Sequence, residues 1–212
     1  MSTNYQNETI ANILTRTCCR KFRDKHVPYE LIQTLIMAAQ SAPSAKNRQP
    51  WYFIVITNRK CKEEIAKAAS IGRQKQFANW DKNKAKAMIK GNSYLNSNDG
   101  IIAQAPLAIL VIRNSNPDYK EALKNELDIK EEEGVACACY SIMLAAWSLG
   151  LGTAWLCSAL YIKTKLKRIL KDYGVNWQKT WEPRVILALG YPRTLLSKPS
   201  RKPTKDISQT IG

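Results

Sequence analysis

The spacing of apolar residues divides the first part of the chain into a helix, a loop and a strand. Apolar side chains recur at helical spacing in residues 31–42, which predicts a helix that begins near Pro28 and stops at Pro43. Residues 51–57 are almost continuously apolar. Such a run is typical of a central strand that is covered on both faces.

The rest of the chain continues this mixture. Further helices are expected at residues 9–14, 62–90, 132–149 and 163–173. Further extended segments are expected at residues 106–113, 153–158 and 184–189, with a turn-rich break at 91–100. The helix at 132–149 is apolar on nearly all faces and should be buried. The pattern predicts helices around one sheet, in an α+β or α/β fold.

Length and composition favour a single domain over residues 1–212. A chain of 212 residues can bury a core without disulfides or metals. No apolar run reaches the roughly 18 residues of a membrane-spanning helix, and residues 1–8 are polar. We therefore expect a cytoplasmic protein with no membrane partner.

The formal net charge of +16 is the unusual global property. It implies an anionic ligand, a nucleic-acid partner or a lysine-rich surface. Residues 59–90 hold 10 Lys/Arg and 3 Asp/Glu, but few aromatic residues are interleaved to stack on bases. We favour a basic surface and keep a nucleic-acid or acidic-partner binding protein as the alternative.

Cysteine and histidine usage argues against a metal site. None of the six cysteines forms a CxxC pair, and His26 is the single histidine. Cys137 and Cys139 lie in the apolar helical pattern, where free cysteine acts as a small hydrophobic residue. No metal site is predicted.

Two polar segments are candidate sites. Residues 42–51 (APSAKNRQPW) form a proline-bracketed loop between two core elements, where binding residues often lie. Residues 16–22 (RTCCRKF) carry arginines whose planar donors suit a phosphate. The alternatives are an ordinary helix-to-strand connection and an exposed basic turn.

Four motifs together resemble the FMN-dependent nitroreductase family across nearly the whole chain. Residues 16–22 resemble its RRSxRxF element, and residues 42–51 its APSxxNxQPW loop. Residues 144–153 (LAAWSLGLGT) are similar to its LAAxxLGLGT helix end, and residues 186–192 (ILALGYP) to its xIxxLGYP strand.

The resemblance implies an α+β fold with a mostly antiparallel central sheet surrounded by helices. It also implies a homodimer in which the extended tail, residues 193–212, packs on the partner subunit. FMN would bind at the subunit interface, where NADH or NADPH reduces it and a nitro compound, quinone or related small acceptor oxidises it by a ping-pong mechanism.

Residue by residue, the resemblance assigns the FMN site. Arg16, Thr17, Cys18, Arg20 and Arg201 would surround the phosphate, although the family usually has serine where Cys18 stands. A thiol donates weakly, so that contact would pass to the backbone or to Thr17. The flavin ring would be contacted by two sets of residues. Those from the partner subunit are Pro43, Ser44, Ala45 and Asn47, and those in the backbone that follows Gly152 are Trp155, Leu156 and Cys157.

No side chain is predicted to be catalytic, because hydride transfer depends on placing the two rings in contact geometry. Tyr140-Ser141 stands where many family members have Gln-Asn. A flavin reductase of an endogenous enone remains open as a second alternative.

Overall fold

The computed structural model describes residues 7–78, 97–115, 124–194 and 197–211. Its helices are α1 (Glu8–Thr15), α2 (Tyr29–Gln40), α3 (Arg59–Ala78), α5 (Ser97–Gln104), α6 (Lys124–Ser148) and α7 (Lys163–Asp172). Its strands are β1 (Trp51–Ile56), β2 (Leu107–Asn114), β3 (Gly152–Leu156) and β4 (Trp181–Gly190). Single 3-10 turns are η1 (Ala45–Asn47), η3 (Cys157–Tyr161) and η4 (Thr204–Asp206).

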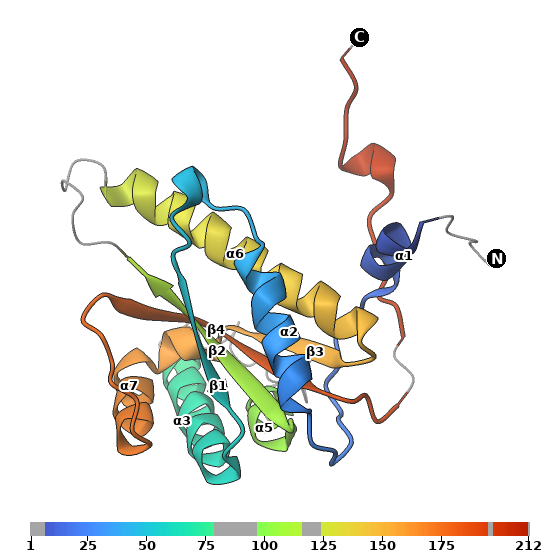
Figure 1. Cartoon of the computed structure of the whole chain (residues 1–212). Helices are drawn as coiled ribbons and strands as arrows, with labels where there is room; N and C mark the ends of the chain where they lie inside the picture. Colours follow the sequence, from blue (N-terminus) through green and yellow to red (C-terminus); the bar gives the residue numbers. More distant parts are fainter. Residues whose placement is uncertain (1–6, 79–96, 116–123, 195–196, 212) are drawn as a thin grey trace.

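Within the described residues the strands form one antiparallel sheet in the order β1-β2-β4-β3. Helices α2 and α6 lie on one face of it, and α3, α5 and α7 lie on the other (Figure 1). This arrangement confirms the predicted α+β class with a central antiparallel sheet. None of the described helices is both long and apolar enough to cross a membrane.

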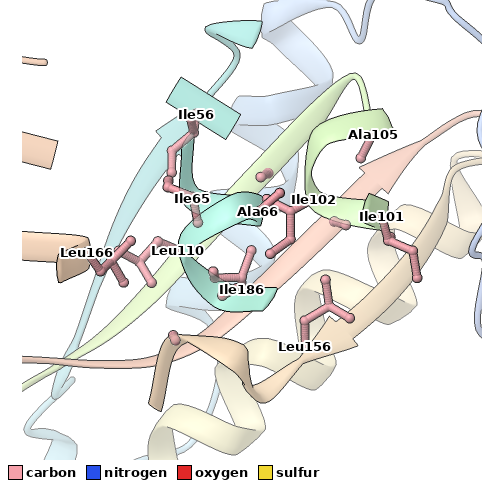
Figure 2. Close-up of a cluster of buried hydrophobic side chains, with 14 of the residues drawn as sticks. Ile56, Ile65, Ala66, Ile101, Ile102, Ala105, Leu110, Leu156, Leu166 and Ile186 are labelled. Atoms are coloured by element: carbon pink, nitrogen blue, oxygen red, sulfur yellow. The ribbon is translucent and has the colours of Figure 1, made fainter. Parts of the chain in front are cut away.

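The two faces of the sheet bury separate hydrophobic clusters, because side chains of a strand alternate between faces. Ile109, Val111 and Leu187 point toward α2 and α6. Leu110 and Ile186 point the other way and pack against α3, α5 and α7, as Figure 2 shows. The central strands β2 and β4 are therefore covered on both faces, as their continuous apolar runs require.

The expectation that residues 51–57 form a central strand is wrong, because β1 lies at an edge of the sheet. Tyr52 and Val55 are exposed. Tyr52 stacks on Trp181, with ring centroids 4.2 Å apart. An aromatic edge strand that rests on another aromatic residue has the same apolar composition as a central strand, and the sequence pattern does not separate the two cases.

The turn-rich break predicted at 91–100 is wrong where it is described, because residues 97–100 open helix α5. The residues Ser97, Asn98, Asp99 and Gly100 have poor helix propensity. Packing overrides it, since Ile101 and Ile102 are almost fully buried in the cluster beside α3. The predicted helix at 79–90 and the break at 91–96 lie outside the described residues.

Helix α6 begins at Lys124, two turns before the predicted start at residue 132. The added turns are polar and are held by charge. Arg113 of β2, which is 4% exposed, places Nη1 2.9 Å from Asp128 Oδ1 and Nη2 3.1 Å from Glu182 Oε2. Arg184 pairs with Glu132 beside it. Ion pairs to the sheet therefore fix a stretch that apolar periodicity does not mark.

The ends of β3 and β4 also differ from the prediction. Cys157 and Ser158 belong to η3 rather than to the strand. Strand β4 begins at Trp181 instead of residue 184 and includes Pro183. The β2–β4 register shifts between Val111 and Ile112, opposite this proline. A proline has no N–H for the ladder, and such an irregularity accommodates it.

We expect Gly190→Ala to destabilise the fold by about 1–3 kcal/mol, because overpacking forces neighbours to move. An added Cβ would lie 2.5 Å from Pro106 Cδ and 3.1 Å from Phe22 Cδ1. Urea unfolding monitored by circular dichroism measures the change. The control is Gly100→Ala in α5, where the nearest atom is Gln104 Nε2 at 3.3 Å and a better helix former should not destabilise. Equal stability of the two variants would contradict the close packing at Gly190.

Candidate functional site

The basic segment at residues 16–20 lies against the start of the edge strand β3. Cys19 donates its backbone N–H to the Thr153 carbonyl at 2.8 Å, and Cys18 forms an isolated bridge with Thr153. A Cβ on Gly152 would lie 2.4 Å from Cys19 Cβ, so the approach requires glycine. The RTCCRKF and LGLGT motifs, far apart in the sequence, therefore form one structural unit.

Arg16 is the C-cap of α1, and its side chain is half-buried. Its backbone N–H donates to the Asn12 carbonyl at 3.1 Å. Its side-chain Nε and Nη1 are buried without a hydrogen-bond partner within the described residues. Buried donors without a partner are costly and usually indicate an acceptor that completes the site. A phosphate or carboxylate suits these donors.

The other predicted phosphate residues differ in how they are placed. Arg20 is exposed and Cys18 is half-buried. Thr17 is buried, and its hydroxyl donates to the Ser197 carbonyl at 3.2 Å, which ties the start of the tail to this segment. Burial raises the pKa of the neighbouring Cys19 thiol, so this sulfur is a packed side chain and not a reactive thiolate.

The loop between α2 and β1 is held in an unusual backbone conformation. Lys46, Asn47 and Gln49 have φ values of 53°, 52° and 52°, in the left-handed region that non-glycine residues rarely adopt. Ser44 Oγ accepts the Gln49 backbone N–H at 3.0 Å and closes the loop. Strain of this kind often accompanies a binding function. Of the three residues, only Asn47 is among the contacts that the resemblance implies, and the sequence carries no signal for the positive φ of Lys46 and Gln49.

This loop and the end of α1, which leads into the basic segment, touch α6 at separate points. Ser44 Cβ lies 3.2 Å from the position that a Cβ of Gly134 would take. Trp147 Nε1 donates to Thr15 Oγ1 at 2.9 Å, next to Arg16. Trp147 comes thirteen residues after Gly134, a separation of about 20 Å along the helix. One chain therefore does not bring all the predicted site residues together.

The backbone that follows Gly152 presents the remaining candidates. Leu156 is buried in the cluster beside α3, so that only its main chain can face a ligand. Trp155 is half-buried and packs on the opposite cluster beside α6. Cys157 is exposed at the start of η3. On the adjoining face of α6, burial raises the pKa of Cys139 to about 12.

The tail extends away from the body of the chain. Figure 1 shows residues 197–211 passing α1 and ending clear of the other elements. Arg201 is exposed and donates to the carbonyl of its neighbour Ser200, at 3.3 Å. Ile207 and Ile211 are 67% and 91% exposed. Arg201 is thus not joined to Arg16 by any contact within the described residues of one chain.

The arrangement suits binding of an anionic ligand more than side-chain acid–base chemistry. Arg16 supplies donors, the Gly152–Leu156 strand supplies backbone groups, and the strained loop supplies a rigid surface. His26 is exposed in the connection before α2. Among the described residues, no three His, Cys, Asp or Glu side chains gather as metal ligands.

Comparisons with known proteins agree with this geometry. The sequence model of the Nitroreductase family matches residues 13–191. A protein of Methanothermobacter thermautotrophicus that bears the name NADH dehydrogenase/NAD(P)H nitroreductase is 28% identical over 186 residues, which cover 87% of this chain and 78% of the relative. The iodotyrosine deiodinase of Hydra vulgaris is 25% identical, and the matched region covers 95% of this chain and 72% of that protein.

The crystal structure of a BluB-like flavoprotein from Clostridium difficile 630 has the same fold. Its TM-score is 0.82 at 28% identity, over 97% of this chain and 100% of that one. The likeness therefore extends over the sheet, both helical layers and the tail.

We expect Lys46→Gly to stabilise the protein by about 0.5–1 kcal/mol, because glycine adopts φ > 0 without the steric penalty of a Cβ. Chemical unfolding followed by tryptophan fluorescence measures the change. The matched control is Lys67→Gly on the exposed face of helix α3, which should destabilise by about 1 kcal/mol. Destabilisation of similar size in both variants would show that the loop at Lys46 is not strained.

Proposed function

Because this chain belongs to the nitroreductase family, we propose that it is an NAD(P)H-dependent FMN oxidoreductase that works as a homodimer. The observation that carries the proposal is the pair of buried donor atoms of Arg16, Nε and Nη1, which have no partner within the described residues. The names of the relatives, an NAD(P)H nitroreductase and a flavoprotein, support the nicotinamide donor and the flavin.

The residues at the start of β3 fit the FMN phosphate. Arg16 offers two buried donors, and Arg20 and the half-buried Cys18 flank them on the same segment. The hydroxyl of Thr17 donates to Ser197, so we assign its contribution to the backbone N–H and to fixing the tail. Arg201 would join this shell from the tail. The hydrogen bond from Thr17 to Ser197 already holds the start of the tail against the basic segment.

The ring would lie on the backbone that continues from Thr153. We assign Trp155, Leu156 and Cys157 to this contact, and Pro43, Ser44, Ala45 and Asn47 of the second subunit to the opposite side. Two observations support a shared site: the loop and the end of α1 next to Arg16 meet α6 about 20 Å apart, and α1 buries none of its residues. Its exposed Ile10, Ile13 and Leu14 are suited to a partner surface.

When bound, FMN would take a hydride from NADH or NADPH and pass electrons to a nitro compound, a quinone or a related acceptor in alternating half-reactions. The protein's own residues hold the phosphate, fix the ring plane and exclude water. No side chain need give or take a proton, which fits the lack of a histidine among the assigned residues.

The relatives leave the acceptor open, since they include a nitroreductase and a deiodinase. An enone reductase remains an alternative on the same scaffold. Steady-state assays of the FMN-loaded protein with nitroaromatics, quinones and enones, each with NADH and with NADPH, would decide among them. The cytoplasmic location and the nucleic-acid alternative remain untested predictions; absence of low-salt binding to DNA and RNA would exclude the latter.

We expect Arg16→Ala and Arg201→Ala each to weaken FMN binding about 10- to 100-fold, because each removes charge-assisted hydrogen bonds of about 1.5–3 kcal/mol. Flavin fluorescence during dialysis measures the dissociation constant. Arg168→Ala, an exposed arginine on α7, removes the same charge and should bind FMN normally. If the three variants lost FMN equally, the assigned phosphate shell would be wrong.

Mixing two impaired chains tests whether each site is shared. A dimer of one Arg16→Ala chain and one Asn47→Gly chain has both changes in one site and neither in the other. We expect the isolated mixed dimer to retain about half of the wild-type FMN, while each parent homodimer retains little. Flavin absorbance per chain provides the measurement. No recovery in the mixed dimer would place both residues in a site built from one chain.

A further inference from the structure

A cleft of about 550 Å³ opens on the side of the sheet opposite α2 and α6. It lies between the end of α3, the turn η3 and the start of α7, which Figure 1 shows side by side. The residues that line it are Ala68, Ile71, Gly72, Lys75, Leu160, Tyr161, Ile162, Lys163, Thr164 and Lys165. The volume is in the range of small-molecule sites. None of the proposed FMN contacts lines it.

Part of the cleft wall is apolar and exposed to solvent. Ile71, Leu160 and Tyr161 are 47%, 39% and 44% exposed, a cluster of apolar surface contributed by two elements. The base is tightly packed, because a Cβ on Gly72 would lie 2.5 Å from Ile162 Cγ2. Exposed apolar residues that gather in a cavity, rather than singly, are typical of a binding site.

The rim is cationic. Lys75 comes from α3, and Lys163 and Lys165 come from the first turn of α7. None of these three lysines makes an ion pair within the described part of the chain. Lysines in the first turn oppose the helix dipole, and no acidic residue in that turn offsets them. An anion at the rim would complement this charge.

We propose that the cleft is a second small-molecule site and that its ligand is an aromatic carboxylate. The flat, apolar body would rest on Ile71, Leu160 and Tyr161, and the carboxylate would lie between Lys163, Lys165 and Lys75. A large polyanion is disfavoured because the wall between the lysines is apolar. The site adjoins the turn η3, which begins at Cys157 in the proposed ring-facing segment. The proposal itself is independent of the flavin chemistry.

The test is calorimetric titration of the FMN-loaded protein with 2-naphthoate and with 2-naphthamide, its uncharged analogue. We expect naphthoate to bind about tenfold or more tightly, and Lys163→Gln/Lys165→Gln to remove that advantage while naphthamide binding stays the same. Ile71→Ser, at an exposed position, should weaken both ligands. The matched control is Lys171→Gln/Lys179→Gln, which removes two exposed charges outside the cleft.

Several results would overturn the proposal. They are no naphthoate binding at millimolar concentration, equal affinity for the two ligands, or equal loss in the control variant. If naphthoate perturbs the flavin absorbance and binds the Lys163→Gln/Lys165→Gln variant as tightly as the wild type, the ligand lies at the flavin instead. If the proposed function is wrong, the protein will not retain FMN, which is a separate observation. The same titration would then be carried out on the flavin-free chain.

Discussion

The backbone hydrogen bond from Cys19 to Thr153, made across a glycine, is the constraint on which the rest of the site depends. It brings the N-terminal segment to the edge of β3, where a side chain on Gly152 would block it. Three residues earlier, at the end of α1, Arg16 carries two buried donor atoms, Nε and Nη1. Thr17, between these two residues, donates its hydroxyl to Ser197 at the start of the tail. Anion donors, strand backbone and tail therefore lie around one contact between segments more than a hundred residues apart.

The parts of the fold that follow from local pattern were predictable from the sequence. The helix at residues 31–42, the glycine-rich end of α6 and the strands at 106–113 and 184–189 all have periodic or continuous apolar residues. The parts that depend on distant partners were not. Helix α5 forms because Ile101 and Ile102 reach a core built by α3, and α6 starts early because its acids meet Arg113 and Arg184.

The candidate site shows the same division. Motif resemblance located the basic segment, the loop and the backbone after Gly152, and the structure joins the first and the last of these. The left-handed backbones of Lys46 and Gln49 were not predictable, because neither is glycine and their conformation is imposed by closure of the loop through Ser44. The separation of loop and basic segment along α6 could not be read from the sequence either, since it depends on which faces of α6 each one meets.

Helix α6 is the rigid element that separates the loop from the basic segment. It is a continuous helix of 25 residues that contacts the loop near its middle and the end of α1, next to the basic segment, near its C-terminus. In a dimer with shared sites, the loop would serve one flavin and the basic segment the other. Each α6 would then connect two flavin sites as a rigid element. A small displacement of the helix when one site binds FMN would change the geometry of the second site. Cooperativity between the two sites would need no additional moving part.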